Sequence, residues 1–327
     1  MAATTTDGST AVGPVPFKDI CGAMPLPSAA TPRPSDLRQW VRCYQGTWVP
    51  EYHVPGIVAI RESFAPRRGD VVLVSPPKCG TTWLKALAFA TMARGAHPPA
   101  GAGHPLRRLN PHDCVPFMEM LFAAGCGGKM DTLPSPRLMA THMQHSVLPA
   151  SITHNPDCKI ICMCRDPKDM LVSMFHFASK LAPNISFSDV FEAACEGTNI
   201  SGPIWDHLLG YWNASKANPE AVLFLRYEEM LRDPVEGVRK LARFVGQPFS
   251  PAEEEAGAAT DVARLCSFDT LRSLEINRPA AAARYGNDWY FRKGEARDWA
   301  NHMTPDMARR LDGIIQEKLR GSGLSFA

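Results

Sequence analysis

The chain has 327 residues, 45% of them hydrophobic, and its 35 basic and 33 acidic residues give a net charge of +2. This length and apolar content are enough to bury a sizeable core in one large α/β domain or two smaller ones. The balanced charge gives no sign of an extended nucleic-acid surface or of a membrane-binding face, so any anion site must be local.

The N-terminal segment, MAATTTDGSTAVG, is small and polar and lacks the apolar core of a signal peptide and the arginines of a transit peptide. No apolar run is long enough to cross a bilayer. Ten cysteines are scattered along the chain without paired zinc-site spacing, which favours a reducing compartment and no metal. We therefore expect a cytoplasmic protein with a flexible tail over residues 1–30 and a single domain over residues 31–327.

The first part of the domain is rich in aromatic residues. We interpret Ser35–Arg42 as a short helix and Ile57–Phe64 as the first strand, and the polar residues Arg67–Asp70 as a turn.

The segment that follows, VVLVSPPKCGTTWLKALAF (residues 71–89), indicates a strand, a loop and a helix. Val71–Val74 is an unbroken apolar run, typical of a strand buried on both faces in a parallel sheet. Pro76 and Pro77 end it, and the apolar residues after Thr82 are spaced as on one helix face. The start of such a helix, together with Lys78 and two threonine hydroxyls, predicts a phosphate or sulfate site.

Residues 94–137 are rich in glycine, proline and histidine and include PHDCVPFMEMLF (residues 111–122). A long irregular stretch in a compact domain is either functional or mobile. We interpret this one as part of an acceptor pocket, with a surface excursion as the alternative.

Two further strands end in polar residues. Leu138–Met143 contains His142 near its end, and Lys159–Cys164 is followed at once by Arg165. Ligands of open parallel sheets bind beyond the carboxyl ends of the strands, so we expect Lys78, His142 and Arg165 to converge on one crevice.

The remaining chain completes the alternation of strands and helices. We expect helices around Val190–Ala194, over Trp205–Trp212 and over Val238–Val245, and a fourth strand over Ala221–Leu225 that leads into Tyr227. The pattern predicts a single-domain, doubly wound α/β fold with a central parallel sheet flanked by helices. Near the C-terminus, Arg292 and Lys293 stand beside Gly294, a combination able to hold a phosphate.

Several motifs together resemble those of plant-type cytosolic sulfotransferases. Pro77-Lys78-Cys79-Gly80-Thr81-Thr82-Trp83 is similar to their 5′-phosphosulfate loop, and residues 165–173 are similar to their 3′-phosphate motif. Residues 110–117 and the C-terminal RGSGLSF resemble segments of plant members. The resemblance covers nearly all of residues 35–326.

The resemblance implies sulfuryl transfer from 3′-phosphoadenosine 5′-phosphosulfate (PAPS) to a hydroxyl of a small-molecule acceptor, leaving adenosine 3′,5′-bisphosphate (PAP). His142 would be the general base and Lys78 would stabilise the leaving phosphate. The donor would be held by residues of the loop, the 3′-phosphate motif and the C-terminal region: Lys78, Cys79, Gly80, Thr81, Thr82, Trp83, Arg165, Ser173, Tyr227, Ser267, Phe268, Arg292, Lys293 and Gly294. No metal, nucleic acid or membrane partner is implied.

Departures from the family pattern leave other points open. Cys79 replaces a serine or threonine, and its place beside Lys78 at a helix start predicts a lowered thiol pKa and sensitivity to oxidants. Gln144-His145 replaces a frequent Pro-Tyr. The dimer motif of animal relatives keeps only Thr304, which favours a monomer or weak dimer. The acceptor stays open among hydroxysteroids, flavonoids, hydroxyjasmonate, strigolactone precursors and desulfoglucosinolates.

Two other functions compete with this one. A phosphate-loop kinase requires a Gly-Lys-Ser/Thr triplet, which the sequence lacks. A catalytically silent nucleotide-binding or interaction protein would keep the donor site and lose the base, whereas both Lys78 and His142 are present.

Overall fold

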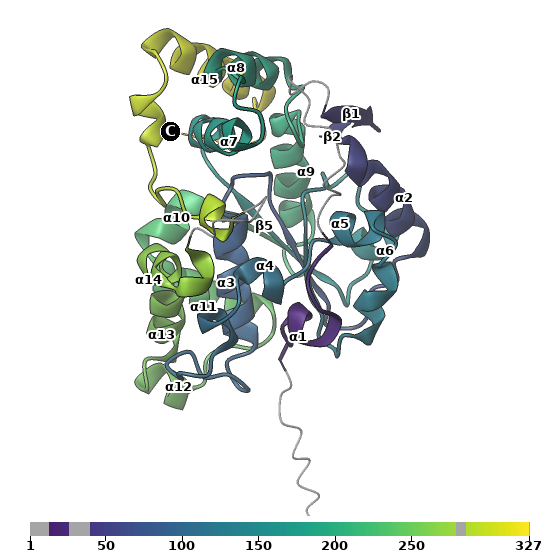
Figure 1. The fold of residues 1–327 in the computed structure, drawn as a ribbon, viewed down its shortest axis with the longest axis vertical. Helices are drawn as coiled ribbons and strands as arrows, with labels where there is room; N and C mark the ends of the chain where they lie inside the picture. Colours follow the sequence, from purple (N-terminus) through teal and green to yellow (C-terminus); the bar gives the residue numbers. More distant parts are fainter. Residues whose placement is uncertain (1–12, 26–39, 279–285, 327) are drawn as a thin grey trace, which may run out of the picture.

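The computed structural model describes residues 13–25, 40–278 and 286–326 (Figure 1). In this part of the chain a four-stranded sheet has the order β4-β3-β5-β6, and each neighbouring pair is parallel. Its strands are β3 (Val71–Val74), β4 (Leu138–Thr141), β5 (Lys159–Cys164) and β6 (Val222–Arg226). The predicted α/β fold with a central parallel sheet is confirmed.

Helices cover both faces of this sheet. Successive strand residues point to opposite faces, so each strand contributes apolar side chains to both. Val72 and Val74 belong to one hydrophobic cluster, with residues of α2, α5, α7, α8, α9 and α15. Val71 and Leu73 belong to a second cluster, with residues of α3, α11, α13 and α14. The α-helices after α1 (Phe17–Cys21) are α2 (Val54–Ser63), α3 (Thr81–Met92), α4 (Pro111–Cys114), α5 (Met118–Ala123), α6 (Ala150–Thr153), α7 (Pro167–Leu181), α8 (Phe187–Glu196), α9 (Ile204–Ala217), α10 (Tyr227–Arg232), α11 (Pro234–Phe244), α12 (Pro251–Glu255), α13 (Ala258–Leu265), α14 (Phe268–Ser273) and α15 (Pro305–Lys318).

Of the elements predicted before the sheet, one is wrong and another is contradicted at its C-terminal end. Where Ser35–Arg42 was expected to be helical, residues 35–39 lie outside the described part and Val41–Tyr44 is a strand, β1, paired antiparallel with β2 (Thr47–Pro50). Gln45 and Gly46 both have positive φ (50° and 80°), the geometry of a tight hairpin turn.

The expected strand at Ile57–Phe64 is helix α2 instead. Its buried residues Gly56, Ile57 and Ile60 follow a helical spacing, and Pro55 lies in its first turn, where proline is well tolerated. An apolar run of this length is ambiguous between strand and helix, and here packing against α5 selects the helix.

Part of the expected N-terminal tail packs on the domain. Helix α1 (Phe17–Cys21) buries Phe17 completely, and Lys18 forms an ion pair with Asp113 at 3.1 Å. Residues 13–25 therefore differ from the predicted flexible tail, whereas residues 1–12 and 26–30 lie outside the described part.

A buried ion pair joins the starts of two strands. Asp70 precedes β3 and Arg137 precedes β4; both side chains are 0% exposed, with 2.6 Å between Arg137 Nη2 and Asp70 Oδ2. Asp70 also accepts hydrogen bonds from the main-chain N–H groups of Arg67 and Arg137. The residue predicted as part of a polar turn thus anchors the sheet.

Among the described residues no helix is both long and apolar enough to cross a membrane.

Candidate active site

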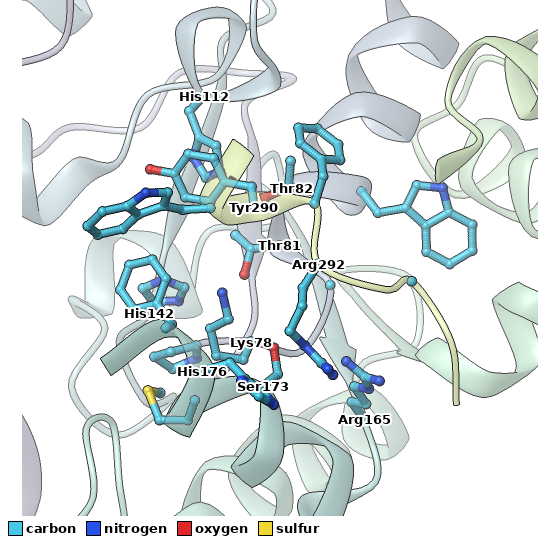
Figure 2. Close-up of a pocket in the computed structure, with 18 of the residues that line it drawn as sticks. Lys78, Thr81, Thr82, His112, His142, Arg165, Ser173, His176, Tyr290 and Arg292 are labelled. Atoms are coloured by element: carbon cyan, nitrogen blue, oxygen red, sulfur yellow. Dashed lines mark hydrogen bonds between the residues drawn. The ribbon is translucent and has the colours of Figure 1, made fainter. Parts of the chain in front are cut away.

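A cavity of about 1160 Å³ lies beyond the carboxyl ends of the parallel strands (Figure 2). All the residues predicted for the site line it, with the exception of Cys79: Lys78, Gly80, Thr81, Thr82, Trp83, His142, Arg165, Ser173, Tyr227, Ser267, Phe268, Arg292, Lys293 and Gly294. The predicted convergence of Lys78, His142 and Arg165 is confirmed, because β3, β4 and β5 are parallel and end at the same edge of the sheet.

The loop between β3 and α3 is tightly constrained. Lys78 has a positive φ of 70°, which is rare for a residue with a side chain and is typical of functional loops. Gly80 has a φ of 91°, and a Cβ atom there would lie 2.8 Å from Tyr227 Cδ2 and 2.9 Å from Met163 Sδ. Glycine is therefore required at residue 80 by both its backbone conformation and its neighbours.

Lys78 lies in an excess of positive charge. Burial lowers the pKa of Lys78 to about 7, and the nearby Lys180, Arg165 and Arg292 act in the same direction. Its Nζ lies 4.3 Å from the centre of the Phe177 ring, and no described carboxylate forms an ion pair with it, whereas Lys180 pairs with Asp288 at 3.8 Å. Cations gathered in this way fit an anion of more than one charge.

Cys79 corrects the sequence-based expectation. Its side chain is 0% exposed and belongs to the hydrophobic cluster on the α7 face of the sheet, and its main-chain N–H donates to the Pro76 carbonyl at 3.2 Å. Burial raises the pKa of the Cys79 thiol above its usual value, and this effect exceeds that of nearby Arg165. Cys79 is thus a buried thiol behind the loop instead of the expected thiolate.

A second cationic corner lies at the start of α7. Asp166 caps this helix by accepting the main-chain N–H of Lys168 at 2.8 Å, and the cap places Arg165 at the end of β5 and Ser173 on the helix. Arg165 donates to the Glu295 carbonyl at 2.6 Å and stacks on the Tyr227 ring, 4.6 Å from its centre. Its buried Nε has no hydrogen-bond partner among the described residues.

Arg292 and Lys293 reach this corner from the C-terminal part of the chain. Asp298, which is 3% exposed, pairs with Arg292 at 2.7 Å and with Lys293 at 2.6 Å. The buried Nε of Arg292, like that of Arg165, lacks a partner among the described residues. Two arginines that line one cavity thus each keep a guanidinium N–H that can donate a hydrogen bond to a phosphate group.

Aromatic rings form part of the cavity wall. The Trp83 and Tyr227 rings meet edge to face with centres 5.4 Å apart. Gly294, with a φ of 73°, lies against Phe268: a Cβ there would be 2.5 Å from Phe268 Cδ2. Ser267 caps α14 by accepting the main-chain N–H of Thr270. The wall presents flat apolar faces, which suit a purine base.

His142 faces the cavity in a fixed orientation. Its ring Nδ1 lies 2.7 Å from the main-chain oxygen of Ser75, and its main-chain N–H donates to Glu119 Oε1 at 2.6 Å. Since a carbonyl oxygen only accepts, Nδ1 carries the proton and Nε2 has the free lone pair. Burial lowers the pKa of His142 to about 4, against the opposing hydrogen bond to Ser75. The imidazole is therefore neutral at physiological pH.

The rest of the cavity is mainly apolar and aromatic. Its lining includes Trp40, Tyr52, Met120, Phe177 and Trp289. Residues 94–137 contribute His112, Phe117 and Met120 to the cavity, in accord with the prediction that they form part of a pocket. Such a surface suits an apolar ring system with few polar groups.

The contacts of four polar residues that shape the site were not predicted from the sequence. Ser75 bonds to both His142 and Thr81, and Glu119 holds the His142 main chain. His112 bonds to Thr82 and to the buried Lys85. The sequence carried a signal for Lys85, by its position on the helix next to the loop, and for His112 and Glu119, by their place in the segment 94–137 that was expected to line a pocket. In the described part of the chain no cluster of three or more His, Cys, Asp or Glu is arranged to hold a metal ion.

Comparison with known proteins identifies the family. The family model for the sulfotransferase domain matches residues 68–323. The chain is 43% identical over 292 residues to cytosolic sulfotransferase 6 of Arabidopsis thaliana (86% of this chain, 88% of the relative). It is 40% identical over 290 residues to flavonol 3-sulfotransferase of Flaveria bidentis (86% and 91%).

Solved structures agree with this result. A crystal structure of a candidate steroid sulphotransferase from Arabidopsis thaliana superposes with a TM-score of 0.71 at 37% identity, covering 88% of this chain and 89% of that one. Mouse sulfotransferase SULT7A1 complexed with PAP gives a TM-score of 0.66 at 26% identity, covering 87% and 95%. The chain therefore belongs to the sulfotransferase family, with plant cytosolic sulfotransferases among its relatives.

Proposed function

We propose that this protein transfers a sulfuryl group from PAPS to a hydroxyl of an apolar small molecule, with His142 as general base. One observation carries the proposal. Lys78, Arg165 and Arg292 line a single cavity together with a neutral histidine whose Nε2 is the unprotonated nitrogen. A nucleotide-binding protein without catalysis has no need of the histidine.

The donor's charges fit the two cationic corners. Lys78, Thr81 and Thr82 would bind the 5′-phosphosulfate at the start of α3, where unpaired main-chain N–H groups also point at the ligand. Arg165, Ser173, Arg292, Lys293 and Gly294 would hold the 3′-phosphate. The unpartnered Nε atoms of Arg165 and Arg292 support this assignment, because a phosphate oxygen would satisfy both. Trp83, Tyr227 and Phe268 would contact the adenine.

The chemistry then follows from His142. Its Nε2 takes the proton of the acceptor hydroxyl while the acceptor oxygen forms a bond to sulfur and the bond from sulfur to the 5′-phosphate oxygen breaks. Lys78 stabilises the negative charge that develops on the departing phosphate. The hydrogen bond from Nδ1 to Ser75 keeps the ring in the reactive tautomer throughout.

The acceptor would lie on the aromatic side of the cavity, with its hydroxyl toward His142. The flavonol named for one relative supports a flat, apolar acceptor. The cytosolic names of other relatives support the cytoplasm as the compartment. A monomer or weak dimer stays a prediction, as does the absence of a metal.

Calorimetric titration with PAP and with ATP tests the donor assignment. We expect PAP to bind far more tightly, since only PAP carries the 3′-phosphate. At a concentration of 100 times its Kd, PAP should stabilise the fold by about 2.7 kcal/mol. Equal or tighter binding of ATP would contradict the assignment. Incubation with labelled PAPS and a plant metabolite extract would then identify the acceptor.

A further inference from the structure

A fully buried lysine lies behind the phosphosulfate loop. Lys85 is on α3, one turn after Thr82, and its side chain is 0% exposed. Its Nζ is 2.8 Å from the main-chain oxygen of Val115, 3.1 Å from His112 Nδ1 and 3.5 Å from the centre of the Phe117 ring. A buried ammonium is costly without partners, and a methionine of similar length would pack here without that cost.

The contacts of Lys85 determine where the protons lie. The Val115 carbonyl only accepts, so Lys85 Nζ donates to it, and either as an ammonium or as an amine it has a further proton to donate to His112 Nδ1. His112 therefore carries its proton on Nε2, which lies 2.9 Å from Thr82 Oγ1 and donates to it. Because the Thr82 oxygen accepts this hydrogen bond, the Thr82 hydroxyl proton is free to be donated to another group. Thr82 lines the cavity, so that group can be a ligand there.

The His112 ring is held in place from two sides. It stacks on Phe117 with centres 5.6 Å apart, and its centre lies 4.2 Å from that of the Tyr290 ring (Figure 2). Burial, and next the charge of Lys85, lower the pKa of His112 and keep it neutral. Burial lowers the pKa of Lys85 well below its ordinary value, and this effect exceeds the opposing attraction of the buried Glu119.

We propose that Lys85 and His112 are positioning residues that fix the Thr82 hydroxyl as a hydrogen-bond donor to the 5′-phosphosulfate. The hydrogen bonds from Lys85 to His112 and from His112 to Thr82 orient the Thr82 hydroxyl from behind the cavity wall, without placing a second ammonium in the cavity. Charge-assisted, aligned donors of this kind bind an anion more strongly than a freely rotating hydroxyl. The inference rests on the proposed function, which supplies the anion.

A double-mutant cycle tests the proposal through PAP binding, because PAP keeps the 5′-phosphate. We expect Lys85→Met to weaken PAP binding by about tenfold, the size of one charge-assisted hydrogen bond. In a Thr82→Val background the same change should have no further effect. Additive losses would overturn the proposal, because they would mean that Lys85 acts independently of Thr82.

A second ligand that lacks the 5′-phosphate distinguishes a positioning role of Lys85 from a general role in folding. Adenosine 3′-monophosphate has the 3′-phosphate and lacks the 5′-phosphate, so it should bind parent and Lys85→Met equally. Equal weakening of both ligands would overturn the proposal. Failure of the parent to bind PAP would instead refute the proposed function, so the two failures are distinguishable.

Two variants of His112 test the direction of the hydrogen bonds even where Lys85→Met does not fold. Gln places an amide N–H near the position of Nε2 and should keep PAP affinity within a few fold of the parent. Asn places its amide near Nδ1 and leaves Thr82 without the donor, so PAP affinity should fall by about tenfold. In ¹⁵N NMR spectra, the parent His112 should show a protonated Nε2, and Lys85→Met should lose this preference. Equal PAP affinity of the Gln and Asn variants, or a protonated Nδ1 in the parent, would overturn the proposal.

Discussion

The pH dependence of donor use follows from Lys78 and His142. In the free enzyme the pKa of Lys78 is lowered to about 7 by burial and by the cations around it, and that of His142 is lowered to about 4. Lys78 acts when protonated, so its contribution is lost as pH rises through about 7. His142 acts when neutral, so its contribution is lost as pH falls through about 4.

The quantity to measure is kcat/KM for PAPS, which reports the free enzyme. It should be flat between the two limbs and fall about tenfold per pH unit above pH 7, hence about 100-fold by about pH 9. At saturating PAPS the phosphosulfate charge raises the pKa of Lys78, so the alkaline limb of kcat should move to higher pH.

Lys78→Arg is the matched control, because a guanidinium stays charged over this whole range. Whatever its absolute rate, this variant should lack the alkaline limb. All assays need one ionic strength, since salt screens charge and weakens anion binding. A parent kcat/KM that stays constant from about pH 6 to about pH 9 would refute the reasoning on Lys78.

Three further predictions concern the surroundings of the site. Gly80→Ala should lower the free energy of unfolding by about 1–3 kcal/mol more than Gly246→Ala, measured in urea, because both glycines have positive φ but only Gly80 has close neighbours. Mild peroxide should affect PAP binding of the parent and of Cys79→Ser equally, because the Cys79 thiol is buried and protonated; selective protection by the substitution would restore the thiolate hypothesis. Asp70→Ala should lower the free energy of unfolding by about 3–5 kcal/mol, since the buried Arg137 guanidinium keeps, among the described residues, only the exposed Asp131 as an ion-pair partner, whereas Asp157→Ala, at an exposed pair, should change it by less than about 1 kcal/mol. Similar losses for Asp70→Ala and Asp157→Ala would contradict this account of the buried pair.

The site's donor half could be predicted from the sequence because its residues occur in short local patterns. The apolar run Val71–Val74 indicated a strand buried on both faces, and Thr81 was correctly placed at a helix start. Parallel strands then bring Lys78, His142 and Arg165 to one edge, a consequence of topology that needs no contact information.

The supporting contacts could not be predicted, because they join segments that are distant in sequence. Glu119 meets the His142 main chain across 23 positions, and Lys85 meets Val115 across 30. The buried state of Cys79 was missed for a related reason. The charge of Lys78 and the helix start suggested a thiolate, but the direction of the side chain, which only the folded loop sets, decided the pKa.

The Ile57–Phe64 segment shows how packing decides an ambiguous pattern. Its apolar residues fit a strand or a helix, and the helix is chosen because α2 lies against α5. Likewise, the polarity of Asp70 suggested a turn at the surface, and only its partner Arg137, 67 positions away, explains why a carboxylate is buried there.

The most direct test of the account is the effect of His142→Ala on PAP binding and on sulfuryl transfer. Lys78 and Arg165 follow β3 and β5, whereas His142 follows β4. PAP affinity measured by calorimetry should therefore stay close to that of the parent. kcat should fall by about 10²–10⁴-fold, the usual contribution of a positioned general base. His145→Ala, at a histidine outside the cavity lining, is the control and should keep near-parent rates. A folded His142→Ala protein that sulfates its acceptor at near-parent rates would contradict the central claim.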